Sequence, residues 1–218
     1  MIQISGRPLL ITDCDEVLLH MMRHFSDWVA EAHDIAFTPQ PSDFSQALRH
    51  RSTGDIVAAD KVWPLLDDFF HSAMHLQTLT PHVIESLGRI GEVADIIVLT
   101  NLADSFHQQR VAQLEAVGIR HRVVCNQGEK GPAVASLVAG QQGGPVVFVD
   151  DIPSHHSSVA RHRPDVWRLH MVADPDFAHL IPPAPKAHKR IDRWAEATPW
   201  IMDRLTGGAP ATIDDSRT

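Results

Sequence analysis

The sequence predicts an α/β protein in which helices cover a parallel β-sheet, with a small, mainly helical domain inserted into it. Three features of the 218-residue chain support this fold class. Short apolar stretches rich in β-branched residues indicate buried strands. From residue 95 onward these stretches alternate with helical patterns, an order typical of parallel sheets. Between the first two stretches the alternation is absent, and helical patterns take its place.

Five strands are expected, separated in the second half of the chain by three helices. The first helical pattern carries Phe106, Val111 and Leu114 on one face, and Gly118 is expected to end it. The strands lie at residues 8–12, 94–100, 122–125, 145–149 and 166–172, and the helices at residues 104–117, 132–139 and 154–161.

The segment from residue 17 to about residue 90 contains helical stretches and no convincing strand. These stretches lie at residues 18–32, 41–49, 53–70 and 81–89. We therefore expect residues 22–80 to form an insert, and residues 1–21 and 81–206 to form the core. A last short helix should open with Thr198 as N-cap and Pro199 at its first position. Residues 207–218 are expected to form a disordered tail.

Composition disfavours several classes of protein. A formal net charge of −8 disfavours binding to nucleic acid or anionic lipid through bulk charge. No stretch resembles a signal peptide or reaches the length of a membrane helix. Two cysteines are too few for a disulfide framework. We therefore expect a soluble, cytoplasmic protein without nucleic-acid or membrane partners; a homodimer is left open, because the sequence does not fix the oligomeric state.

Reactive side chains follow three of the predicted strands. The carboxyl ends of parallel strands meet at one edge of the sheet, where α/β proteins bind their ligands, so these side chains should converge on one crevice. They are Asp13 and Asp15 after the first strand, Thr100 and Asn101 after the second, Asp150 and Asp151 after the fourth, and Lys130 at the start of the helix before the fourth strand.

These residue types suit phosphoryl chemistry. Crowded carboxylates repel one another, and a cation removes that cost. Mg²⁺ takes one or two carboxylates together with waters and substrate phosphate oxygens. A carboxylate nucleophile such as Asp13 can attack phosphorus and split one difficult hydrolysis into two easier steps. A second carboxylate, Asp15, can protonate the leaving oxygen and later deprotonate the attacking water.

Four motifs, in order, resemble the signatures of the haloacid-dehalogenase-like hydrolase superfamily. They are residues 9–18 (LLITDCDEVL), 97–101 (IVLTN), 130–132 (KGP) and 147–151 (VFVDD). The resemblance implies a Rossmann-like, doubly wound core with a helical cap between the first and second motifs. It also implies magnesium-dependent hydrolysis of a small phosphate monoester through an aspartyl-phosphate. Asp13 would be nucleophile and metal ligand, and Asp15 would be the acid/base residue with its backbone carbonyl on the metal.

The same resemblance implies roles for the remaining motif residues. Thr100 and Lys130 would hold the phosphoryl oxygens, with Asn101 beside them in the substrate site. Asp150 would bind Mg²⁺, and Asp151 would bind it directly or through water.

Glu16 departs from the family pattern, which usually has glycine at this position. A bulky acid there can alter the backbone turn or add charge beside the metal. It leaves open a catalytically weak protein that binds phosphate or a partner on the same fold. A phosphotransferase of the same chemistry is the other alternative, whereas Asp15 disfavours the dehalogenase branch.

Several histidines and arginines are candidates for binding a metal or substrate, but the sequence favours structural or solvent-exposed positions for them. For His155 and His156 a polar loop is favoured over a place at the mouth of the site. For Arg49 and Arg51 a solvent-exposed face of the insert is favoured over contact with a second anionic group of the substrate. Two pairs have the i, i+4 spacing of helical metal ligands, yet neither has an adjacent Glu or Cys in a known ligand pattern, so solvated or core histidines are expected. These pairs are His20 with His24 and His71 with His75.

Overall fold

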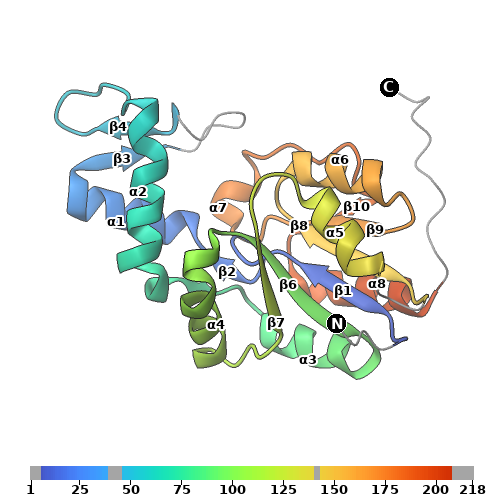
Figure 1. Cartoon of the computed structure of the whole chain (residues 1–218). Helices are drawn as coiled ribbons and strands as arrows, with labels where there is room; N and C mark the ends of the chain where they lie inside the picture. The colour runs from blue at the N-terminus through green and yellow to red at the C-terminus, as the bar shows by residue number, and fades with distance from the viewer. Residues whose placement is uncertain (1–5, 39–45, 140–142, 208–218) are drawn as a thin grey trace.

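A six-stranded, wholly parallel sheet lies at the centre of the protein (Figure 1). The computed structural model describes residues 6–38, 46–139 and 143–207. The strand order is β10-β9-β8-β1-β6-β7, so the predicted α/β class with a doubly wound parallel sheet is confirmed. The strands are β1 (Leu9–Thr12), β6 (Asp95–Asn101), β7 (Arg122–Asn126), β8 (Val146–Asp150), β9 (Trp167–His170) and β10 (Lys189–Arg190).

Helices cover both faces of the sheet, because side chains alternate across each strand. In β1, Leu10 packs with α3 (Val83–Val93) and α8 (Trp194–Thr206). Its neighbours Leu9 and Ile11 face the other way, toward α5 (Lys130–Ala139) and α6 (Pro153–His162). Helix α4 (His107–Ala116) flanks the β7 edge, and α7 (Pro175–Ala178) follows β9. Within the described residues, no helix is long and apolar enough to cross a membrane.

The insert projects from one side of the sheet (Figure 1). Its helices and short strands enclose an aromatic cluster around Phe25 and Phe69, and Leu102 and Phe106 of the core join that cluster. Two short antiparallel strands connect the insert to the core, and Thr80 Oγ1 donates to the carbonyl of Val17 beside them. The elements are β2 (Leu19–His20), α1 (Met22–His33), β3 (Ile35–Phe37), β4 (Leu48–His50), α2 (Ala59–Ser72), η2 (Met74–Leu76) and β5 (Thr78–Leu79).

The insert contains strands that the sequence did not predict. The prediction of a helix at residues 41–49 is wrong for its last residues, because Leu48–His50 pairs with Ile35–Phe37 in an antiparallel ribbon. Residues 41–45 lie outside the described part. The ribbon buries Ile35 and Leu48 against the insert's helices, a long-range contact that local periodicity does not reveal. The helix expected from residue 18 begins at Met22 instead, because residues 19 and 20 pair with β5.

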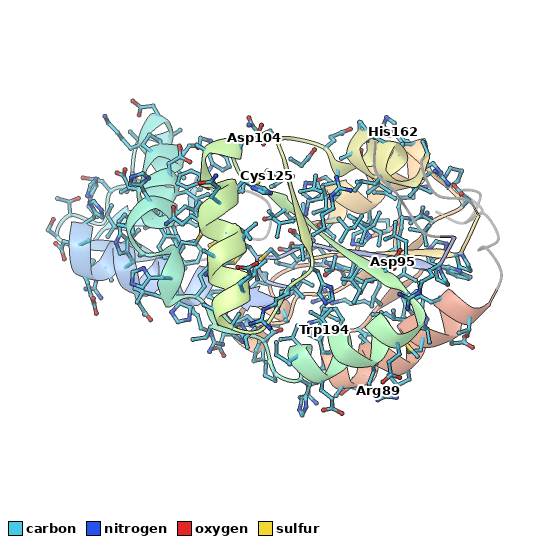
Figure 2. All side chains as sticks on the ribbon, turned by 60° about the horizontal axis from the view of Figure 1, so that its bottom comes forward. Arg89, Asp95, Asp104, Cys125, His162 and Trp194 are labelled. Atoms are coloured by element: carbon cyan, nitrogen blue, oxygen red, sulfur yellow. The ribbon has the colours of Figure 1, made fainter. Side chains whose placement is uncertain are left out.

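The last helix begins four residues before the predicted N-cap. It starts at Trp194 and carries Pro199 in its interior. The Trp194 ring is buried, and its Nε1 donates to the carbonyl of Val17 at 2.8 Å. This anchor lies in the layer between helices and sheet (Figure 2). Tertiary packing therefore overrides the local Thr-Pro signal. The predicted disordered tail lies outside the described residues, apart from Gly207.

Protonation of the buried His188 should contribute to the loss of stability of this core in acid. Its Nδ1 accepts the N–H of Arg168 at 3.0 Å, and its ring packs on Trp167. Burial, with Arg168 next, lowers the pKa of His188 to about 4. Since the unfolded chain protonates this imidazole near pH 6.5, its contribution is present at neutral pH and is lost as pH falls from about 6.5 to 4. His188→Asn, which keeps an acceptor, should flatten the melting-temperature profile between pH 7 and 4.

The exposed His75→Asn variant provides the matched control and should leave that profile unchanged. A His188→Asn profile as steep as that of the wild type would show that His188 contributes nothing to acid unfolding.

Candidate active site

The predicted reactive residues gather at the carboxyl-terminal edge of the sheet, on the side of the insert. Asp104, which follows β6, and Cys125, near the end of β7, lie on this side, whereas Asp95 at the start of β6 lies at the opposite edge (Figure 2). Thr12 aligns with Val149 of the adjacent strand β8, and the N–H of Asp13 donates to the Val149 carbonyl at 2.8 Å. The register therefore brings the residues after β1 beside those that end β8.

Lys130 joins two carboxylates at this edge. Its Nζ lies 2.7 Å from Oδ2 of Asp13 and 2.7 Å from Oδ2 of Asp150. All three side chains are buried. Burial alone would lower the pKa of Lys130, but Asp13 and Asp150 outweigh it and raise that pKa. The lysine therefore stays charged between the two acids.

Gly131 explains how the lysine reaches this place. A Cβ at Gly131 would lie 2.4 Å from Ser158 Oγ, closer than real side-chain contacts. The first turn of α5 can approach α6 only because this residue has no side chain. The N–H of Gly131 donates to Ser158 Oγ at 3.1 Å. The Lys-Gly pair of the third motif thus sets the position of the Lys130 ammonium.

Asp150 is fixed on its other oxygen as well. Its Oδ1 accepts the N–H of Ile152 and faces Nδ1 of His155, both at 2.9 Å. Burial opposes ionisation, but Lys130 and then His155 hold the pKa of Asp150 well below its usual range. His155 and His156 belong to helix α6 and are buried, so the predicted polar loop is wrong.

The acidic group has the donor set that a hard divalent cation prefers. Burial raises the pKa of Asp13 to about 6, even though Lys130 opposes the shift. Burial, and then the nearby Asp150 and Asp13, raise the pKa of Asp151 well above its usual value. Ligand atoms of Asp13, Asp150 and His155 lie within 4.8 Å of one another. A shared cation removes the repulsion between crowded carboxylates, so the carboxylates of Asp13, Asp150 and Asp151 fit Mg²⁺.

Asp15 is held by residues that sequence analysis missed. Nη2 of Arg110 lies 3.0 Å from Oδ1 and 2.9 Å from Oδ2 of Asp15, and Gln77 Nε2 donates to Oδ1 at 2.6 Å. The Arg110 side chain is fully buried. No local pattern could reveal this group, because Gln77 and Arg110 lie 62 and 95 residues from Asp15 along the chain. The side chains of Arg110 and Gln77 therefore fix the orientation of Asp15.

Thr100 and Asn101, at the end of β6, differ in their surroundings. Thr100 Oγ1 is buried and has no hydrogen-bond partner among the described residues. The Asn101 amide donates to the Gly128 carbonyl at 2.8 Å and accepts from Asn126 at 2.7 Å. Thr100 is thus free to donate to a ligand, whereas Asn101 ties together the ends of β6 and β7.

Glu16 occupies a position whose backbone favours glycine. Its φ is 58°, in the left-handed region, where a side chain costs about 1 kcal/mol. Two hydrogen bonds offset this cost, because Oε1 accepts the N–H groups of Met21 and Met22 at 2.8 and 2.7 Å. The acid thereby satisfies backbone donors at the start of α1. The departure from the family pattern preserves the turn and links it to the insert.

Solved structures with this fold are named for several activities. A haloacid dehalogenase-like hydrolase from Burkholderia xenovorans aligns over 92% of this chain and 99% of its own, with a TM-score of 0.60 and 14% identity. The hydrolase YfnB from Bacillus subtilis, bound to magnesium, aligns over 89% and 98%, with a TM-score of 0.63 and 11% identity. A β-phosphoglucomutase from Thermotoga maritima aligns over 91% and 100%, with a TM-score of 0.60 and 15% identity.

No protein-family model and no curated protein matches the sequence. The similarity therefore lies in the fold, and the chain has the haloacid-dehalogenase-like fold that its four motifs predict.

From the strain and the hydrogen bonds at Glu16, we expect a definite order of stability among variants at this position. Glu16→Gln keeps an oxygen for the Met21 and Met22 N–H groups and should melt near the wild type at pH 7. Glu16→Gly loses both hydrogen bonds but relieves the left-handed strain. Glu16→Ala loses the bonds and keeps the strain, so it should be least stable, by about 1 kcal/mol relative to glycine. Urea unfolding of the three variants measures this order, and alanine equal to or above glycine would contradict it.

Proposed function

We propose that this protein is a magnesium-dependent phosphohydrolase that cleaves small phosphate monoesters through an aspartyl-phosphate on Asp13. The observation that carries the proposal is the buried arrangement of Asp13, Lys130 and Asp150, with Nζ 2.7 Å from both carboxylates. A nucleophilic carboxylate needs positive charge beside it to approach a phosphate dianion. This arrangement supplies that charge in a site where burial strengthens electrostatic interactions.

Asp13 is oriented for attack by two donors. The N–H of Cys14 donates to Oδ1 at 2.7 Å, and Lys130 contacts Oδ2. Lys130 and the hydroxyl of Thr100 would hold phosphoryl oxygens, since Thr100 Oγ1 has no hydrogen-bond partner in the described part of the chain. Asp13, Asp150 and Asp151, with the backbone carbonyl of Asp15, would hold Mg²⁺, which neutralises phosphate charge when bound.

Asp15 would move protons in both halves of the reaction. It would give a proton to the leaving alkoxide when Asp13 attacks phosphorus, and take one from the water that hydrolyses the aspartyl-phosphate. Arg110 and Gln77 hold its carboxylate at 2.6–3.0 Å, so its position is set before substrate arrives. Fixed placement of this kind contributes to catalysis by lowering the cost of reaching a reactive geometry.

The presence of Asp15 also bears on two other reactions known for this fold. Dehalogenation needs no acid to protonate a leaving halide, so a held carboxylate at this position favours phosphoryl transfer. A phosphotransferase would use the same residues and differ only in the acceptor. Product analysis with an alcohol acceptor present separates transfer from hydrolysis, and halide release from a 2-haloacid tests the dehalogenase alternative.

Magnesium should stabilise the protein through Asp150. Binding to the native state alone adds about 2.7 kcal/mol at a hundredfold excess over Kd, which raises the melting temperature. Asp150→Asn should lose most of this rise, because the variant removes a ligand charge from the acidic group. Asp104→Asn, an exposed acid on the same side of the sheet, is the matched control and should keep it. An undiminished rise in Asp150→Asn would place the metal elsewhere.

Asp13 and Asp15 should have separable roles. Asp13→Asn removes the nucleophile, so turnover of an aryl phosphate should fall to background. Asp15→Asn should still allow Asp13 to attack an activated aryl phosphate, since a good leaving group needs little of the roughly 10²–10⁴-fold help of a general acid. The second step would then stall, giving a burst of phenol and a phosphoryl group that mass spectrometry locates on Asp13.

Stability must be measured alongside, because Asp15→Asn weakens the partner of a buried guanidinium. Removing a buried charge's partner costs about 3–5 kcal/mol, although asparagine keeps one acceptor oxygen. Melting curves at the assay temperature therefore accompany the kinetics. Adduct on another residue, or equal losses in both variants on every substrate, would overturn the assignment of roles.

A further inference from the structure

A second group of potential metal ligands lies beside the site and shares no residue with the proposed magnesium ligands Asp13, Asp15, Asp150 and Asp151. Ligand atoms of Glu16, His20 and Asp174 lie within 4.8 Å of one another, and all three residues are buried. They come from three different segments: the turn after β1, strand β2 and the loop before α7. An imidazole with two carboxylates is a donor set found in protein zinc sites.

Two of these side chains present buried atoms that no hydrogen bond satisfies. Oε2 of Glu16 and Nδ1 of His20 have no partner among the described residues, although the residues are only 1% and 6% exposed. The other oxygen of Glu16 is fully used by Met21 and Met22. Leaving a buried carboxylate oxygen and a buried imidazole nitrogen unpaired is costly. A shared cation would satisfy both atoms.

The spacing suits a cation between the side chains. His20 Nδ1 and Asp174 Oδ2 are 3.6 Å apart, longer than a hydrogen bond. Two ligands of a tetrahedral ion with bonds of 2.0–2.1 Å are separated by about 3.3–3.4 Å. For this pair, closing around an ion requires a shift of only a few tenths of an ångström.

One basic side chain contacts this group. Arg23 pairs with Asp174, its Nε and Nη2 lying 2.6 and 2.7 Å from the two carboxylate oxygens. The Arg23 side chain is 39% exposed, and among the described residues no lysine or arginine forms an ion pair with Glu16. Burial, and then Arg23, lower the pKa of His20, which keeps its imidazole neutral and able to bind a metal.

We propose that Glu16, His20 and Asp174 form a second metal site, distinct from the magnesium site, which takes Zn²⁺ or a similar transition ion with water completing the coordination. The imidazole favours a transition ion over Mg²⁺. Such an ion would connect the turn that follows β1, the first strand leading into the insert and the loop after β9. The inference does not rest on the proposed function, because its readout is metal binding.

Calorimetric titration with Zn²⁺ of the untagged full chain tests this site, with Mg²⁺ in excess to occupy Asp13, Asp150 and Asp151. The wild type should bind one Zn²⁺ tightly. Glu16→Gln, which keeps an oxygen for the Met21 and Met22 N–H groups, and His20→Asn should each weaken binding at least tenfold. Asp150→Asn and the exposed His75→Asn should retain it. Anomalous scattering at the zinc edge should place the ion among the three side chains.

Two outcomes would overturn the proposal of a zinc site. Zinc binding that survives both Glu16→Gln and His20→Asn, or that is lost in Asp150→Asn alone, assigns the ion to another place and overturns the proposal. An absence of zinc uptake by the wild type overturns it too, and leaves a proton as the occupant of the space between Glu16 and His20. Melting curves establish that each variant is folded, and Glu16→Gln alone suffices if His20→Asn is not.

Discussion

The buried ammonium of Lys130 between Asp13 and Asp150 is the interaction on which the arrangement of this site depends. It joins the end of β1, the first turn of α5 and the end of β8, three elements that are far apart in the sequence. Without the lysine, the two buried carboxylates that contact it would repel each other, and one of them would take up a proton. With the lysine present, Asp150 stays ionised and Asp13 is held in place. The packing of α5 on α6, made close by Gly131, is what brings the lysine there.

The sequence predicts the parts of the fold whose signals are local. Buried strands such as Val146–Asp150 are apolar and end at acids, so their carboxyl ends could be recognised and placed on one edge of a parallel sheet. The same logic brought Asp13, Lys130 and Asp150 to one place. Glu16 was identified as a departure from the pattern. Only the structure shows that it has a left-handed backbone conformation, which favours glycine, and that two hydrogen bonds to its side chain offset the strain.

What the sequence did not predict arises from contacts between distant residues. Arg110 lies within an ordinary helical pattern, and nothing near it indicates that its guanidinium is buried against Asp15. The ribbon of Ile35–Phe37 with Leu48–His50 has too few residues for a period of two to be detected. Trp194 begins the last helix because its ring is anchored beneath the sheet, which outweighs the local Thr-Pro signal. In each instance burial decides the outcome, and burial is a property of the whole chain.

The apolar cluster of the insert has a consequence for how firmly the insert is held to the core. Leu102 and Phe106 follow strand β6 in the core, yet both are buried among the insert's aromatic side chains. Any swing that parts the insert from the core must expose these two side chains to water, at about 1.5–3 kcal/mol each. The burial of these two core side chains therefore favours the joined arrangement of insert and core.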